Sequence, residues 1–312
     1  MQSITLDEIR ALLPSLDLLP AMEAGFVAYS SGQAVVPPVG ELLLDKGEAH
    51  IKYGYLRDAP YYVIKIASGF YDNPKLGLSS SNGLMLLFRQ ETGELLCILL
   101  DQGYLTDVRT AVAGAVCARH LAPRRVNRIG IVGTGTQARL QLSYLKTVTS
   151  RRDVLVWGRS ESSLEQFRHE TASKGYKVET TRKPADILRT CNLIITVTPS
   201  KEPLLLAEDL QGGTHMTAVG SDTPFKQELD SMILKRADVV VADSIAQCLE
   251  RGEIHKALEN RHIQKEDLLE LGNVIAGKIP GRTGDQQITV ADLTGVAVQD
   301  IKIATAVFEA LK

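Results

Sequence analysis

The sequence predicts an α/β fold with two parts: a doubly wound parallel sheet and, before it, a smaller α+β domain. Two observations support this prediction. From residue 129 onward, short apolar runs alternate with segments whose apolar residues recur at helical spacing, which is typical of a parallel sheet covered by helices. Before residue 100, apolar runs follow one another with a hairpin signal at residues 90–93, which indicates a mostly antiparallel sheet.

Length and composition indicate a globular protein of two domains. The chain has 312 residues, more than a single hydrophobic core normally organises. Hydrophobic residues make up 44% and charged residues 23%, and the net charge of −2 argues against nucleic acid as the main partner. No apolar run is long enough to span a membrane and the N-terminus lacks a signal-peptide pattern, so no membrane partner is expected.

The spacing of cysteine and histidine predicts neither a disulfide framework nor a metal site. The four cysteines are scattered, with no C-x-x-C pair, and the six histidines form no ligand motif. We therefore expect reduced thiols in a cytoplasmic protein that binds no metal.

The N-terminal part is predicted to combine helices with an antiparallel sheet. Residues 3–32 are expected to be helical because Leu6, Ile9 and Leu13 share one face, with Ser3 or Thr5 as the cap. The prolines at 37–38 end this stretch. Strands are expected at residues 40–44, 49–56, 61–67, 84–88 and 95–100.

The remainder of the chain is predicted to form the parallel sheet. A helix at residues 106–121 leads into it and ends before Pro123. Strands are expected at residues 129–132, 154–157, 177–180, 193–198, 215–219 and 239–242, and helices at residues 162–173, 185–190, 225–236 and 245–251. A last helix, about residues 296–311, is expected to return to the first domain. The predicted domains are therefore 1–120 together with 296–312, and 121–295.

Residues 133–138 form a G-x-G-x-x-A turn between an apolar strand and a helix, the order found in Rossmann-type dinucleotide-binding units. Gly133 permits the tight turn, Gly135 lets a pyrophosphate approach the backbone, and Ala138 lets the helix pack close to the strand. The N-terminus of the helix offers free N–H groups and a positive dipole end to the phosphates. The alternating strands and helices that follow favour this interpretation over a purely structural glycine turn.

The choice of cofactor depends on the tip of the second strand of the nucleotide domain. An acidic residue there binds the ribose of NAD, whereas an arginine accommodates the 2′-phosphate of NADP. The chain has Gly158, Arg159 and Ser160 at this point and no carboxylate. We predict NADP(H), with NAD(H) left open because Arg159 could also be a solvated arginine that opens a helix.

Several further motifs resemble the ornithine cyclodeaminase/μ-crystallin family. They keep the family's order over nearly the whole chain. Besides the glycine turn they are GLS at residues 77–79, LTDVRTA at 105–111, TVTP at 196–199, AVGSD at 218–222, ELD at 228–230 and DLTG at 292–295.

The resemblance implies a homodimer in which the N-terminal sheets pair. It also implies an active site between that sheet and the nucleotide domain. The family's reactions centre on an imine next to a carboxylate, and its members include ketimine and pyrroline-2-carboxylate reductases, alanine dehydrogenases and amino-acid cyclodeaminases. Some members bind small ligands without obvious turnover.

The resemblance also assigns roles to four side chains. Arg109 matches the family's substrate-carboxylate arginine, which agrees with the bidentate fit of a guanidinium to a carboxylate. Lys65 matches an active-site lysine and Ser80 falls near a substrate-contacting hydroxyl. Asp222 matches the catalytic aspartate. The alternatives are a surface arginine for Arg109, a strand lysine facing water for Lys65, and a helix cap for Asp222.

For Asp222, the following Thr223 and Pro224 offer a cap and a first helical residue of their own, which favours a catalytic role for the aspartate. Beyond these residues, the glycine turn, the strand ends and the resemblance together predict the cofactor contacts. They are Thr110, Gly133, Thr134, Gly135, Thr136, Gln137, Gly158, Arg159, Ser160, Thr196, Thr198, Pro199, Val219 and Gly220.

Two positions depart from the cyclodeaminase pattern. Val39 stands where the family often has arginine after the paired prolines, and Lys52 stands where cyclodeaminases carry a glutamate. A cationic Lys52 would repel a diamine and suit a second carboxylate, unless it is an exposed strand residue.

The predicted function is therefore an NAD(P)H-dependent reductase of small 2-imino acids, of the ketimine, pyrroline-2-carboxylate or iminosuccinate type, reversible as an amino-acid dehydrogenase. The alternatives are an ornithine cyclodeaminase-type enzyme that eliminates ammonia, and a non-catalytic NADP-dependent ligand-binding protein.

Overall fold

The computed structural model describes residues 1–312, and the chain divides into two compact units. Unit 1 comprises Met1–Thr110 and Val296–Lys312, and unit 2 comprises Ala111–Gly295. No single helix has the length and hydrophobicity of a membrane span; one bent pair, Leu6–Ser15 with Leu18–Ser30, has them by length and composition alone.

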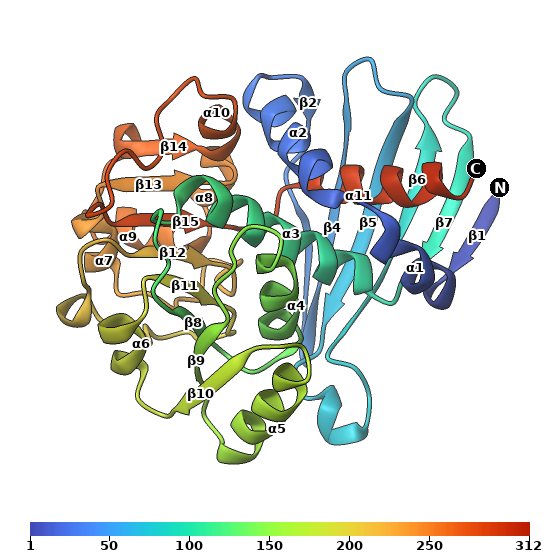
Figure 1. Ribbon diagram of the computed structural model, residues 1–312. Coiled ribbons are helices and arrows are strands. Elements are labelled where there is room, and N and C mark those ends of the chain that lie inside the picture. The colour runs from blue at the N-terminus through green and yellow to red at the C-terminus, as the bar shows by residue number, and fades with distance from the viewer. The chain divides into compact units, whose positions relative to one another are not determined.

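Unit 1 is built on a seven-stranded sheet in the order β1-β7-β6-β5-β4-β2, with β3 paired to β4 (Figure 1). All pairs are antiparallel except β1 with β7. The strands are β1 (Gln2–Thr5), β2 (Ala34–Val35), β3 (Gly40–Leu44), β4 (Gly47–Leu56), β5 (Tyr61–Gly69), β6 (Ser81–Arg89) and β7 (Leu95–Leu100).

The helices of unit 1 are α1 (Leu6–Leu12), α2 (Leu18–Ser30) and α11 (Ala297–Ala310), and α3 (Tyr104–Leu121) begins in this unit. The helical prediction for residues 3–32 is wrong at its start, because residues 2–5 pair with β7 as a parallel strand. Thr5 is the cap of α1, in a capping box with Glu8. Helix α11 packs against α2, β4 and β5 and is the red helix that crosses the sheet in Figure 1.

The two faces of the unit 1 sheet differ in burial. Lys65 is opposite Lys52 on β4 and Met85 on β6, so the three side chains share one face, and all three are buried. The other face is apolar but not fully buried. It carries Ile51, Tyr53, Ile64, Ile66, Leu84, Leu86, Ile98 and Leu100.

Unit 2 is an eight-stranded, entirely parallel sheet in the order β10-β9-β8-β11-β12-β15-β13-β14. The strands are β8 (Ile129–Val132), β9 (Asp153–Trp157), β10 (Lys177–Thr181), β11 (Leu193–Thr196), β12 (His215–Ala218), β13 (Val239–Ala242), β14 (Leu268–Glu270) and β15 (Thr289–Asp292). The order reverses at β8, which pairs with both β9 and β11, and this is the topological switch point of a Rossmann-type sheet. The predicted α/β fold class is confirmed.

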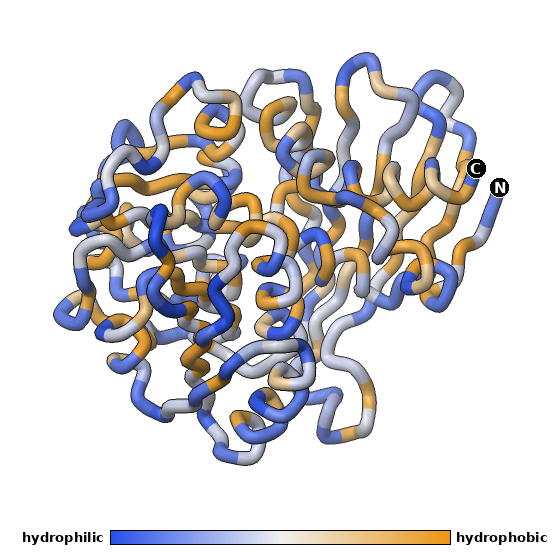
Figure 2. The backbone as a smooth tube through the Cα atoms, in the orientation of Figure 1, coloured by the Kyte–Doolittle hydropathy of each residue, from blue (hydrophilic) through white to orange (hydrophobic).

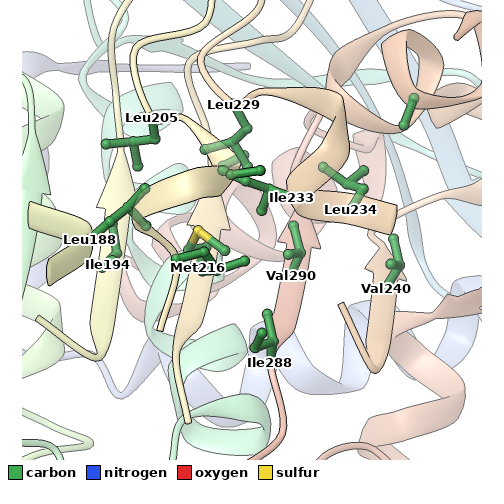
Figure 3. Packing of buried hydrophobic residues seen from close by; sticks show 14 of the residues in the cluster. Leu188, Ile194, Leu205, Met216, Leu229, Ile233, Leu234, Val240, Ile288 and Val290 are labelled. Atoms are coloured by element: carbon green, nitrogen blue, oxygen red, sulfur yellow. The ribbon is translucent and has the colours of Figure 1, made fainter. Parts of the chain in front are cut away.

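The helices of unit 2 cover both faces of its sheet. They are α4 (Thr136–Leu145), α5 (Glu161–Ala172), α6 (Pro184–Thr190), α7 (Ser231–Arg236), α8 (Ile245–Cys248), α9 (Gly252–Glu259) and α10 (Leu271–Ile275). One core cluster joins Leu188 of α6, Ile233 of α7, and Ile194, Met216 and Val290 of the strands (Figure 3). Figure 2 shows β13 as a hydrophobic stretch of the chain, as expected for a strand buried on both faces.

Two predicted helices of unit 2 differ from the structure. The helix expected at residues 225–236 begins only at Ser231, with Asp230 as its cap, and Leu229 instead forms a parallel bridge with Leu205. The segment before Ser231 is held extended by its backbone hydrogen bonds: the Glu228 carbonyl accepts from the amides of Leu204 and Leu205, and the Glu253 carboxylate accepts from the amides of Glu228 and Leu229. The helix expected at residues 245–251 ends at Cys248, and a new helix begins at Gly252, whose φ of 90° suits glycine.

Candidate active site

The glycine turn of unit 2 has the geometry that a dinucleotide phosphate requires. Gly133 has a φ of 125°, a conformation that favours glycine, and Gly135 is the N-cap of α4 with no side-chain cap. A Cβ added at Gly135 would meet no atom within 4 Å, so the space in front of the helix N-terminus is open. Arg139 stabilises the turn by donating hydrogen bonds to the carbonyls of Thr134 and Gly135. The residues present therefore fit a pyrophosphate.

A pocket beside this turn brings together seven of the predicted cofactor residues. Its lining also includes Trp157, the only tryptophan of the chain, together with Val197, Ser200 and Leu204. The seven predicted residues are Gly133, Thr134, Gly135, Gly158, Arg159, Thr198 and Pro199. This pocket joins the carboxyl ends of β8, β9 and β11, where open parallel sheets bind ligands.

The other predicted cofactor residues lie outside this lining. Thr136 lines an adjacent surface depression with Arg139, and Ser160 caps α5 by accepting from the Ser163 amide at 3.1 Å. Thr110, on α3 in unit 1, donates to the Thr106 carbonyl at 2.8 Å. Gln137 lies in the first turn of α4. Thr196, Val219 and Gly220 are at the ends of β11 and β12.

Two arginines lie at the tip of β9, whereas the sequence analysis predicted one. Arg159 is exposed there, and the Arg182 guanidinium, from the end of β10, donates to the Arg159 carbonyl at 3.2 Å. The sequence analysis missed Arg182 because it lies on the neighbouring strand. Two guanidinium groups at this tip give a 2′-phosphate more than one possible partner.

In unit 1, a buried cluster gathers the two cations proposed to bind the substrate. Lys65 of β5 and Arg109 of α3 are 2% and 5% exposed. Asp300 of α11 lies between them, with Oδ2 3.6 Å from Lys65 Nζ and Oδ1 3.1 Å from Arg109 Nε. Arg109 also donates to Gln299 Oε1 at 2.8 Å. The alternatives of a water-facing Lys65 and a surface Arg109 are therefore wrong.

Asp300 is the residue of this cluster that sequence reasoning missed. It is 1% exposed, and neither of its oxygens accepts a hydrogen bond, because Lys65 Nζ is 3.6 Å away and Arg109 Nε, at 3.1 Å, is not aligned. The sequence does hold a signal, since a charged residue interrupts the apolar stripe of the last helix next to Ile301. Asp101, 1% exposed before α3, is a second buried acid here; burial raises its pKa, and the backbone amide of Leu105 and, to a smaller extent, nearby Lys65 oppose that shift.

Lys52 and Ser80 take different positions. Lys52 is buried and directly opposite Lys65, so the alternative of an exposed strand residue is wrong. Ser80 lies in the loop before β6, where its carbonyl accepts from the Phe70 amide at 2.7 Å, and no hydrogen bond links its hydroxyl to Lys65 or Arg109. Lys65 and Arg109 are not uncompensated cations, because both pair with Asp300.

Asp222 follows β12 and forms an ion pair with Lys226, whose Nζ lies 2.7 Å from Asp222 Oδ1. The expectation that Thr223 and Pro224 begin a helix is wrong, since helix α7 begins only at Ser231. Asp222 is thus carried on a turn rather than on a helix start. Ser221 fixes that turn by donating to the Lys226 carbonyl at 2.7 Å.

The fold and the glycine turn define a Rossmann-type dinucleotide-binding protein. A family model described as "Ornithine cyclodeaminase/mu-crystallin family" matches residues 3–312. The chain belongs to this family, as its motifs indicate.

Named relatives cover nearly the full length of the chain. The chain is 42% identical to an uncharacterized cyclodeaminase of Sinorhizobium fredii, over 99% of this chain and 95% of the relative. An archaeal alanine dehydrogenase dimer with bound NAD is 34% identical, with a TM-score of 0.91 over 99% and 95% of the two chains. The iminosuccinate reductase of Paracoccus denitrificans in complex with NAD⁺ is 30% identical, with a TM-score of 0.90 over the same shares.

Proposed function

We propose that this protein is a nicotinamide-dependent reductase of small 2-imino acids that also runs in reverse as an amino-acid dehydrogenase. The observation that supports this most directly is the buried cluster of Lys65, Arg109 and Asp300. Two cations meet one carboxylate there, so the cluster has the charge and the donors to accept a second carboxylate from a substrate. Relatives named as an alanine dehydrogenase and an iminosuccinate reductase act on compounds of this kind.

Each residue then has a defined task. The Arg109 guanidinium and the Lys65 ammonium bind the substrate carboxylate, and Asp300 holds both cations in place before the substrate arrives. A bound nicotinamide cofactor supplies or accepts the hydride at the carbon next to that carboxylate. Asp222, oriented by Lys226, keeps or relays the proton on the substrate nitrogen, because a protonated imine is the more electrophilic form.

For the cofactor we propose NADP(H) over NAD(H). Arg159 and Arg182 stand at the tip of β9, and no carboxylate occupies the position after Trp157 and Gly158 that would bind a ribose 2′-hydroxyl. The alanine dehydrogenase and the iminosuccinate reductase were solved with NAD and NAD⁺. Their cofactors keep NAD(H) as the competing choice, which a direct binding comparison decides.

We also propose a homodimer formed through the open apolar face of the unit 1 sheet. Tyr53, Ile66 and Leu100 on this face are 38%, 38% and 43% exposed, and the residues beside them on the same face, Ile51, Ile64 and Ile98, are apolar and only half-buried. An apolar sheet face of this kind is an expected protein–protein contact. Light scattering should give twice the mass of the chain, and Ile66→Lys should yield a monomer.

Cyclodeamination is the second candidate, favoured by the relative named as a cyclodeaminase. It uses the same carboxylate-binding cations but requires a diamine substrate. The buried Lys52 beside Lys65 argues against a second ammonium group at this site.

The deciding experiment incubates purified protein with NADPH or NADH and follows the absorbance of the reduced nicotinamide. Pyruvate with ammonia, oxaloacetate with ammonia, and cyclic imino acids are the substrates, and ornithine conversion to proline is assayed in parallel. Oxidation of the cofactor by an imino acid supports the proposal. Proline formation without imine reduction would favour the cyclodeaminase, and tight cofactor binding with no turnover would favour a ligand-binding protein.

In the same assay, Arg109→Lys tests the carboxylate site. Lysine keeps the charge but loses the fork that reaches Gln299 and Asp300, so kcat/KM for the imino acid should fall about 10–100-fold. The Kd for the cofactor should stay unchanged, because the Arg109 guanidinium bonds to Gln299 and pairs with Asp300 rather than with the glycine turn.

A further inference from the structure

Glu228 is a fully buried carboxylate that receives hydrogen bonds from two neighbouring strand ends. Its Oε1 accepts from the amide and the hydroxyl of Thr198, at 2.6 and 2.8 Å. Its Oε2 accepts from the Thr196 hydroxyl at 2.8 Å and from the Gly220 amide at 2.9 Å. Thr196 is the last residue of β11, Thr198 lies two residues beyond it, and Gly220 follows β12. One side chain therefore ties both strand ends together.

The backbone at this junction is packed too closely for another arrangement. A Cβ at Gly220 would lie 2.1 Å from the Thr198 carbonyl oxygen and 2.6 Å from Glu228 Oε2. The backbone of Glu228 is also held in place, because Glu253 of α9 accepts from the amides of Glu228 and Leu229 at 2.7 and 3.2 Å. The Glu228 carboxylate is thus bonded to both strand ends, and the Glu228 backbone is bonded to Glu253, which restricts movement of the carboxylate.

The position of this junction gives it a role in cofactor binding. In a Rossmann-type sheet a dinucleotide lies across the switch point, with the pyrophosphate at the first glycine turn. Adenosine lies toward β9 in such a sheet, so the nicotinamide half falls at the ends of β11 and β12. Thr198 and Pro199 line the pocket, and Gly220 precedes the turn that carries Asp222.

We propose that Glu228 is a positioning residue that holds the nicotinamide side of the dinucleotide site and the Asp222 turn in register. Its four donors favour the ionised form, which opposes the effect of burial, and the balance raises the pKa of Glu228 to about 7. The kinetic part of this inference rests on the proposed function, whereas the binding part does not.

Two matched threonines test the proposal without altering the carboxylate. Thr196 and Thr217 are both 0% exposed on neighbouring parallel strands, but the Thr196 hydroxyl bonds to Glu228 and the Thr217 hydroxyl to His215. Valine at either position removes one buried hydrogen bond at nearly constant volume. Thr196→Val should raise the Kd for the reduced dinucleotide at least fivefold, measured by quenching of Trp157 fluorescence, and Thr196→Ser should restore it. Thr217→Val should leave that Kd within twofold of wild type while lowering stability to a similar extent.

Amide hydrogen exchange gives a second readout that needs no cofactor. In Thr196→Val and in Glu228→Gln, the amides of Thr198 and Gly220 should exchange at least tenfold faster, while the amides of β8 keep their protection. If imine reduction is detected, kcat of Thr196→Val should fall more than its KM for the imino acid rises. Unchanged exchange and unchanged Kd in Thr196→Val would overturn the proposal even if Glu228→Gln fails to fold. Amide exchange and the Kd for the dinucleotide are both measured without an imine substrate. A failure of this proposal can therefore be distinguished from a failure of the proposed function.

Discussion

Lys65 of β5 and Asp300 of α11 lie 3.6 Å apart, Nζ to Oδ2, and both side chains are almost completely buried. The same carboxylate lies 3.1 Å from Arg109 Nε on α3. A single acid from the C-terminal helix therefore pairs with two cations from separate elements and leaves the group of three with one net positive charge. The last helix thus helps to position the proposed substrate site as well as closing the unit 1 core.

Asp300→Asn should strongly destabilise the fold. It would leave two buried cations without their shared counter-ion, and removing one partner of a buried ion pair typically costs about 3–5 kcal/mol. Urea unfolding of wild type and variant measures the difference. Asp72→Asn is the matched control, because Asp72 pairs with Lys75 at 2.6 Å on the exposed surface and its loss should have no measurable effect. Equal stabilities for wild type and Asp300→Asn would show that the cluster does not depend on this carboxylate.

Cofactor preference should depend on the two arginines at the tip of β9. Wild type should bind NADPH more tightly than NADH, and Arg159→Ala should weaken NADPH binding by about 1–3 kcal/mol, as for a charge-assisted contact. Arg182→Ala should have a smaller effect in the same direction, because its guanidinium also bonds to the Arg159 carbonyl. Trp157 quenching measures both constants. Equal losses for NADPH and NADH would rule out a 2′-phosphate contact.

Asp222→Asn should remove chemistry while leaving the fold and the cofactor site intact. Asp222 lies on a turn after β12, and its recorded ion pair is with Lys226, so no helix cap is lost. Turnover with an imino acid should fall about 100-fold or more, as for loss of a positioned proton-transfer group. Lys226→Met is the companion variant and should lower turnover by a smaller factor. Wild-type turnover in Asp222→Asn would refute the assignment.

Much of the fold follows from patterns that act over short distances. Apolar runs locate β8, β9, β11, β12 and β13, because these strands are buried and are therefore composed mainly of apolar residues. The strand at residues 2–5 was not predictable in this way, since only its pairing with β7 makes it a strand. The segment before α7 has a helical pattern, but the Glu228 carbonyl accepts from the amides of Leu204 and Leu205, and together with the bridge between Leu229 and Leu205 these bonds keep it extended.

The candidate site was predictable only where a motif marks it. Lys65, Arg109 and Asp222 were singled out by family motifs, but their partners were not. Asp300 and Arg182 come close to their partners through tertiary packing, and no spacing in the sequence records those contacts. Lys226 lies only four residues after Asp222, a spacing that the sequence analysis did not use. Glu228 was quoted as part of a motif without a role, because its function depends on amides and hydroxyls of two strand ends that only the fold brings together.

Stability should fall in acid partly through His215. Burial lowers the pKa of His215 from 6.5 to about 3, so the folded chain keeps it neutral while the unfolded chain takes up a proton below about pH 6.5. The unfolded state is therefore favoured as the pH falls from about 6.5 toward 3. His215→Gln removes this uptake, so the difference in unfolding free energy between wild type and variant should shrink by about 1.4 kcal/mol per pH unit in that window. A difference independent of pH would show that His215 titrates alike in both states.

The choice of substrate should follow the charge around Lys65. Lys52 lies opposite Lys65 on the same buried face, so a diamine such as ornithine would bring its second ammonium toward fixed cations. Like charges about 4 Å apart cost roughly 4 kcal/mol at an effective dielectric near 20, more than the contacts of a short alkyl chain recover. Imine reduction should therefore exceed ornithine cyclodeamination by at least about tenfold in kcat/KM, with a dicarboxylate imine at least as good as a monocarboxylate one.

Lys52→Glu tests whether this residue sets that preference. The variant should narrow the gap between ornithine and the imino acid, because a carboxylate beside Lys65 attracts the second ammonium that lysine repels. Ile51→Glu is the control, since Ile51 is the next residue on β4 and lies on the opposite face of the sheet. The control should leave the ratio of the two kcat/KM values unchanged. Efficient conversion of ornithine to proline by the wild type would overturn this view of the site and make cyclodeamination the better assignment.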